Sequence, residues 1–188
     1  MKRIAFAASI TVLLAAPLAA QAQVASSSII LSGEVEKACV LGDPDVAELS
    51  LGDLTGDDGR LDPGLIGTAV IAQTNIPVAW CNAPSVMTLN AEPLSLVSPP
   101  AYATPANFAR LITFTANLDG WASALSDRPI IGDSAKEGAA LTPHAADPLV
   151  IEISDLATLN AGGTVEQDAF LEAGAYSATI VIGLSVAP

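Results

Sequence analysis

The sequence predicts an all-β fold, most simply a sandwich of two sheets. Its apolar runs are short, rich in β-branched residues and separated by Gly, Pro, Asp or Asn, which is the pattern of strands joined by turns. Seven or eight such runs at this spacing are typical of a β-sandwich. Helical patterning is weak, because the best helical candidate, residues 137–146, is interrupted by Pro143.

The expected strands follow one another along most of the chain. Residues 28–36 alternate, with Ile29, Leu31 and Val35 on one face and polar side chains on the other. The full set of expected strands is 28–36, 46–52, 68–81 with a kink at Pro77, 85–91 after a turn at 82–84, 109–117, 148–154 and 175–186. We find no internal repeat and no linker, so residues 33–188 are expected to form a single domain.

The first 22 residues have the pattern of a cleaved signal peptide. Lys2 and Arg3 precede an apolar run over 4–16, which is too short to cross a bilayer comfortably as a membrane anchor. Ala20-Gln21-Ala22 then offers a small-x-small cleavage site. We therefore expect cleavage before Gln23, transit through the periplasm, and a final location at the cell surface or outside the cell, without membrane insertion.

The chain has two cysteines, Cys39 and Cys81. They could serve as a metal pair, a redox pair, a reactive thiol with a bystander, or a structural bridge. Two cysteines are too few for a tetrahedral zinc site, and their spacing is not that of a C-x-x-C redox motif. Disulfides persist in exported proteins, so we expect a Cys39–Cys81 disulfide that stabilises the fold by roughly 4 kcal/mol.

Charge and composition exclude several classes of partner. The chain has 7 basic and 20 acidic residues and a formal net charge of −13 at pH 7. Such a surface repels nucleic acid and anionic lipid, so we expect neither as a partner. Aromatic side chains are scarce, and as platforms for a carbohydrate we considered Trp80, Trp121, Tyr102 and Tyr176.

An acidic stretch at 53–64 is the best candidate for a metal site. Asp53, Asp57, Asp58 and Asp62 supply the hard oxygen ligands that calcium prefers. The EF-hand register fails, however, because placing Gly at the sixth loop position places Leu at the first. We predict an acidic turn and no tight calcium site, with an irregular calcium loop as the alternative.

No catalytic constellation is evident in the sequence. His144 is the one histidine, it follows Pro143, and no G-x-S-x-G motif accompanies it. We expect it to be a solvated loop residue. The sequence offers no phosphate-binding loop and no cofactor motif, so we expect a non-enzymatic protein without a cofactor.

Three segments resemble bacterial chaperone–usher pilins. Residues 32–54 carry a Gly-x-Val run, Gly33 to Val35, ahead of the first cysteine, and a Leu-Gly turn at 51–52. Residues 75–81 resemble the strand with the pilin's second cysteine. The Ala-Gly-x-Tyr turn at 173–176, followed by a last apolar strand, is shared with spore-coat-U-like archaic pilins.

The resemblance implies an immunoglobulin-like sandwich that lacks one strand and is completed by a donor strand from another subunit. The implied partners are other copies or related pilins, a periplasmic chaperone and an outer-membrane usher. The donor would be the N-terminal extension, residues 23–32, and its candidate plugs are Val24, Ile29, Ile30 and Leu31. The alternative for this segment is an edge strand of its own domain.

The leading expected function is therefore a structural subunit of a surface pilus. The alternatives are a stand-alone secreted binding module, cation-dependent through residues 53–62, and a small secreted hydrolase.

Overall fold

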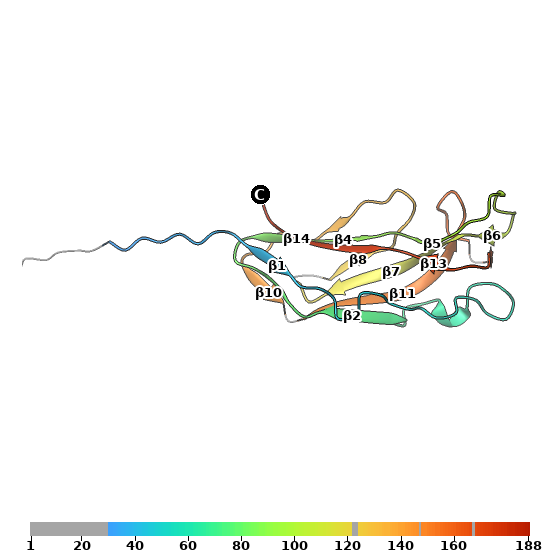
Figure 1. The fold of residues 1–188 in the computed structure, drawn as a ribbon, viewed down its shortest axis with the longest axis horizontal. Coiled ribbons are helices and arrows are strands. Elements are labelled where there is room, and N and C mark those ends of the chain that lie inside the picture. The colour runs from blue at the N-terminus through green and yellow to red at the C-terminus, as the bar shows by residue number, and fades with distance from the viewer. Residues whose placement is uncertain (1–29, 122–123, 147, 167) are drawn as a thin grey trace, which may run out of the picture. The chain divides into compact units, whose positions relative to one another are not determined.

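The structure, a computed structural model, describes residues 30–121, 124–146, 148–166 and 168–188. The chain divides into two units, Met1–Val35 and Glu36–Pro188. In the first unit, residues 30–35 form neither strand nor helix, and Ile30, Leu31 and Val35 are largely exposed. All the strands described below belong to the second unit (Figure 1). No helix in the described ranges is long and apolar enough to cross a membrane.

The largest sheet has six strands and is antiparallel throughout. Its strand order is β13 (Tyr176–Ser177), β5 (Leu94–Leu96), β7 (Leu111–Asp119), β11 (Leu149–Leu159) and β2 (Ala72–Ile76), and β8 (Leu125–Asp127) also pairs with β7. The long central strand β11 pairs with β7 on one edge and with β2 on the other. Its ladder with β7 shifts register between Ser154 and Ala157, where Asp155 adopts a φ of 51°.

The other strands among the described residues of the second unit form three smaller sheets. One has the order β1 (Cys39–Leu41), β3 (Ala79–Cys81), β10 (His144–Ala146), and another has the order β14 (Ile180–Val186), β4 (Ser85–Ala91), β9 (Lys136–Glu137). The third is a parallel pair of β6 (Phe108–Ala109) and β12 (Phe170–Leu171). A 3₁₀ turn, η1 (Pro63–Leu65), begins with Asp62 as its N-cap.

Side chains from the six-stranded sheet and from the sheet of β14, β4 and β9 share one core, as expected of a sandwich. In β4, every second residue from Ser85 to Ala91 is buried, which places Met87 and Leu89 in the interior. These two side chains belong to the same buried cluster as Phe114 from β7 and Ile153 from β11. Period-two burial of this kind is what a strand with one core face and one outer face produces.

Specific polar contacts tie the strands together. The buried carboxylate of Asp127, on β8, accepts a hydrogen bond from the backbone N–H of Ala91 at 2.9 Å. Asp127 thereby links the six-stranded sheet to the end of β4, and Lys136 lies 3.6 Å from its other oxygen. Gly120 has a φ of 101°, and a Cβ there would lie 2.6 Å from the carbonyl oxygen of Pro148, so only glycine fits this turn.

The expected all-β class is confirmed, as are several individual strands. The 85–91 strand appears with the predicted bounds, and the 68–81 run becomes β2 and β3, which are separated at Pro77. The run at 175–186 is instead divided, because residues 176–177 pair with β5 while residues 180–186 pair with β4 of another sheet.

Two of the expected strands are wrong. Residues 30–36 and 46–52 form no strand, although both alternate, because no neighbouring strand pairs with them among the described residues. The run at 137–146, where the sequence argued against a helix, contains none, and its last three residues form β10 against β3. Residues 28 and 29 of the first expected strand lie outside the described residues.

Candidate functional site

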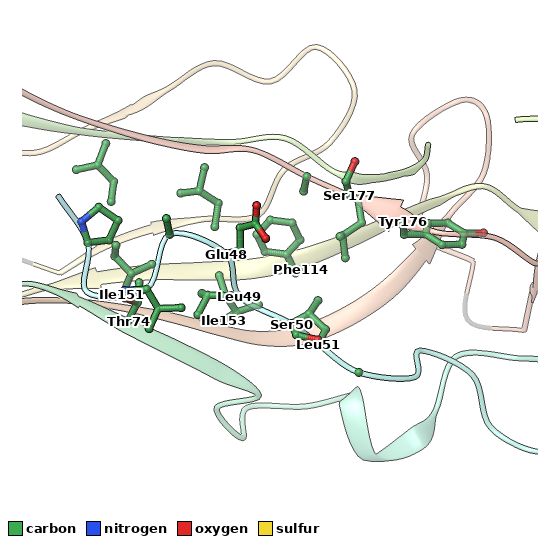
Figure 2. A pocket seen from close by; sticks show the side chains of 18 of the residues that line it. Glu48, Leu49, Ser50, Leu51, Thr74, Phe114, Ile151, Ile153, Tyr176 and Ser177 are labelled. Atoms are coloured by element: carbon green, nitrogen blue, oxygen red, sulfur yellow. Dashed lines mark hydrogen bonds between the residues drawn. The ribbon is translucent and has the colours of Figure 1, made fainter. Parts of the chain in front are cut away.

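An apolar groove with a volume of about 790 Å³ opens into the core of the second unit. Its floor consists of side chains that the sandwich otherwise buries. They are Ile76 from β2, Leu94 from β5, Phe114 from β7, and Ile151 and Ile153 from β11. None of the five is more than 8% exposed. Figure 2 shows three of them, Phe114, Ile151 and Ile153, in the pocket. The groove therefore reaches down to buried side chains of the domain core.

One wall of the groove is formed by the C-terminal strands β13 and β14. Tyr176, Ile180 and Ile182 line it, and the two isoleucines are partly buried against the core. β14 pairs with β4 over its whole length from Ile180 to Val186. On its other edge, no strand of the described chain is paired with it. The wall thus carries a row of backbone N–H and C=O groups that can receive another strand.

The opposite wall is the segment from Leu41 to Leu54, which has two different halves. Its first half is held to β2 and β3. The N–H of Gly42 donates to the carbonyl oxygen of Val78, and that of Asp45 donates to the carbonyl oxygen of Asn75, both at 2.8 Å. The N–H of Val46 donates to the hydroxyl of Thr74 at 3.0 Å.

The second half of this wall, residues 47–52, has no such backbone hydrogen bonds within the described chain. Leu49 and Leu51 pack against the core, whereas Glu48 and Ser50 are exposed. Figure 2 shows Glu48 to Leu51 on this segment, together with Tyr176 and Ser177 from β13. The alternation predicted for 46–52 is real as a burial pattern, but the segment lines the groove instead of closing it.

The groove is almost free of charge. Among the residues that line it, Glu48 is the one ionisable acid or base apart from the phenol of Tyr176. The Tyr176 hydroxyl donates toward the carbonyl oxygens of Glu172 at 2.9 Å and Ala109 at 3.2 Å. Burial, with a smaller contribution from the charge of Glu172, raises the pKa of Tyr176 to about 12. This side chain is therefore neutral at physiological pH and fixes the end of β13.

The disulfide between Cys39 and Cys81 is confirmed. The two residues lie directly opposite each other in the antiparallel pair of β1 and β3. The bond fixes the chain immediately before the segment that lines the groove. It closes a loop with a sequence separation of 42 residues.

Of the predicted donor residues, Ile30 and Leu31 are described by the structure, whereas Val24 and Ile29 lie outside the described residues. Ile30 is 89% exposed and Leu31 is 93% exposed.

The acidic loop uses most of its carboxylates for its own turns. Asp53 accepts hydrogen bonds from the N–H and the hydroxyl of Thr55, and these bonds lower its pKa. Asp58 accepts from the N–H of Arg60. Asp62 accepts from the N–H of Gly64 at the start of η1. For Asp57, the fourth member, the structure shows no comparable bond. Within the described ranges, no group of three or more potential ligands is arranged to hold a metal ion.

His144 is not the loop residue that the sequence predicted. It lies on β10, where it pairs with Cys81 of β3. Its ring meets the buried ring of Trp121 edge to face, with centroids 4.9 Å apart. The sequence around Pro143 did not predict a strand at His144, because the strand forms against a partner more than 60 residues away.

Sequence reasoning did not find the floor of the groove. Phe114, Ile151 and Ile153 lie in runs that were correctly predicted as strands, but nothing in those runs marks them as reachable from outside. Comparison with protein-family models, with curated proteins and with solved structures finds no match for this chain. The function proposed next therefore depends on the groove itself.

Proposed function

We propose that the protein is a non-enzymatic structural subunit of a surface pilus or fibre that assembles by strand donation. The observation that carries this proposal is the open edge of β14 beside a groove whose floor is the domain core. An added strand would pair with β14 through main-chain hydrogen bonds and place every second side chain on the floor.

The occupant we propose is residues 23–32 of another copy of this chain. The extension carries no charged side chain before Glu34, which suits a groove lined mainly by apolar residues. Ten extended residues span at most about 35 Å, and a seven-residue strand such as β14 spans about 23 Å. The extension is therefore long enough to run the whole length of the open edge.

The exposed apolar side chains of the extension support the same occupant. Ile30 and Leu31 project from a stretch without secondary structure. In an extended donor, Ile29 and Leu31 would share one face and Ile30 would take the other. Under this proposal, a periplasmic chaperone and an outer-membrane usher would protect and deliver the subunit before a second copy completes it.

The first test is deletion of residues 23–32, which should abolish fibres and leave a folded subunit that still binds a chaperone. A synthetic peptide of residues 23–36 should bind the shortened protein and raise its melting temperature. A stable, monomeric full-length protein that unfolds when the segment is removed would show an internal strand and favour the stand-alone module.

Two matched peptides test the register of the donor. One carries Ile29→Asp and Leu31→Asp, and the other carries Ile30→Asp. A charge placed on the floor should abolish binding, because a buried unpaired carboxylate is strongly disfavoured. A charge on the outer face should have little effect. An equal loss of binding with both peptides, or no loss of binding with either peptide, would contradict insertion with one face inward.

A further inference from the structure

Aromatic and arginine side chains gather at the end of the second unit that contains β6 and β12. Figure 1 places β6 at the end opposite β1 and β10. The parallel pairing of these strands sets Phe108 opposite Phe170, with ring centroids 5.5 Å apart. The guanidinium of Arg60 lies over the Phe170 ring at 4.8 Å. Three segments far apart in the sequence thus build one aromatic surface.

Arg110 holds the neighbouring loop against this surface. Its Nε donates to the buried carboxylate of Glu172 at 2.8 Å, and its Nη2 donates to the carbonyl oxygen of Tyr102 at 3.1 Å. The same guanidinium lies 5.1 Å from the centroid of the Tyr102 ring. The positive charge of Arg110 is therefore already matched by Glu172.

A cavity of about 210 Å³ lies beside Phe108 and Arg110. Phe108 and Arg110 line it, and apolar side chains and one hydroxyl supply the remainder: Thr104, Ala109, Leu111, Leu159 and Ala161. Its volume is below the roughly 300–1,000 Å³ of pockets for drug-sized molecules, so it suits a ligand of a single ring. None of its lining residues lines the groove described above.

The backbone before Phe108 is held in an unusual conformation. Asn107 has a φ of 67°, and within the described residues Asp155 is the other non-glycine with a positive φ. The carbonyl oxygen of Asn107 accepts the N–H of Phe170 at 2.8 Å, which fixes the turn. Phe108 itself is 39% exposed and lines the cavity. Residues held in sparsely populated backbone regions cluster at ligand sites.

We propose that this cavity binds one neutral pyranose unit of a glycan. The face of an aromatic ring carries negative potential and attracts the C–H bonds on the flat side of a pyranose. The guanidinium and the Thr104 hydroxyl can hydrogen-bond to sugar hydroxyls. The apolar wall of Leu111, Leu159 and Ala161 accommodates the methyl group of a deoxy or acetamido sugar. A negative charge on the sugar should add little affinity, because Arg110 already forms an ion pair with Glu172 and the chain carries a net charge of −13.

This binding site does not depend on assembly through the groove, because the two sites share no lining residue. A subunit could bind a sugar here whether or not its β14 edge is occupied.

The test is saturation-transfer difference NMR on the purified full chain with three probes. The probes are the methyl glycosides of fucose, N-acetylglucosamine and glucuronic acid at equal concentrations. The expected result is saturation transfer to at least one of the two neutral glycosides, and little or none to the glucuronide. Transfer to no probe, or to the glucuronide alone, would overturn the proposal.

Two variants and a matched control locate the site. Phe108→Ala removes the aromatic platform, and Ala161→Leu fills the cavity from an exposed loop without removing a native contact. Each should weaken binding by about tenfold. Trp80→Ala removes an aromatic of similar exposure from β3 and should leave binding unchanged.

Melting curves must show that the variants are folded. If Phe108→Ala does not fold, Ala161→Leu decides the question alone. Binding that persists with the cavity filled, or that is lost equally in Trp80→Ala, would place the sugar elsewhere and contradict the assignment.

Discussion

The strands β11 and β14 show how differently the two sides of this domain are built. β11 pairs with β2 on one edge and β7 on the other, and its inward side chains are buried. β14 pairs with β4 alone, and its inward isoleucines are half-buried along the groove. Both strands are long and apolar, so the difference lies in the number of partners. Among the described residues β11 is paired on both edges and β14 on one edge only, and this open edge of β14 is the basis of the proposed function.

Removing the disulfide between β1 and β3 should have the largest effect on the free energy of unfolding. The double variant Cys39→Ser with Cys81→Ser is expected to lower the free energy of unfolding by about 2–5 kcal/mol. Urea denaturation measures this loss, and reduction of the unmodified protein is the control and should match it. A loss below 1 kcal/mol would show that the wall of the groove is held without the bond.

A matched pair of leucines tests the comparison directly. Leu149 on β11 is fully buried, and Leu184 on β14 is partly buried. Leu149→Ala should cost about 2–5 kcal/mol, and Leu184→Ala should cost clearly less, because Leu184 is only partly buried. Chemical denaturation of the chain lacking residues 23–32 measures both.

Adding the 23–36 peptide should then increase the cost of Leu184→Ala and leave that of Leu149→Ala unchanged. Equal costs without peptide would mean that β14 is already as well packed as β11.

The sequence predicted the paired strands of this fold better than the segments that line the groove. The strand at 85–91 is found where alternation placed it, and the break at Pro77 separates β2 from β3. In contrast, residues 46–52 alternate and bury Leu49 and Leu51, yet form no strand. Alternation predicts which side chains are buried, but it does not predict whether a neighbouring strand is available for backbone hydrogen bonds.

Long-range pairing explains the other failures. The C-terminal run alternates continuously, so the pattern does not reveal that it leaves β5 and joins β4 at residues 178–179. The aromatic surface beside the 210 Å³ cavity depends on Phe108 meeting Phe170, and these residues are 62 positions apart in the chain and have no local signal in common. The disulfide was predictable, because compartment and cysteine count leave few alternatives.

Titration of Tyr176 should produce a smaller effect at the end of β13. Burial raises its pKa to about 12, above the ordinary value of 10. The unfolded chain therefore loses this proton first, so the stabilisation is complete below pH 10 and is lost as the pH rises from 10 to 12. Thermal melts over this range should show a decline that is reduced in Tyr176→Phe. An identical slope in the variant would exclude Tyr176 as its cause.

The smallest expected effect concerns Asp155 at the register shift in β11. Its hydrogen bond from Arg128, with a further contribution from the N–H of Gly67, lowers the pKa of this carboxyl. The stabilisation is therefore present above the ordinary pKa of Asp and is lost as the pH falls through the lowered value. Asp155→Asn keeps a residue that tolerates positive φ and should cost less than about 1 kcal/mol at neutral pH. Acid denaturation should show this difference vanish at low pH.

Hydrogen exchange at β14 tests the central claim most directly. The chain lacking residues 23–32 is followed by amide exchange with and without the 23–36 peptide. The account predicts that amides of β14 that do not bond to β4 exchange slowly only when the peptide is present. The amides of residues 150–153 in β11 serve as the internal control and should not change, since both edges of the strand are already paired there. Protection of β14 that is the same without the peptide, or that appears equally at β11, would contradict an open edge that receives a donated strand.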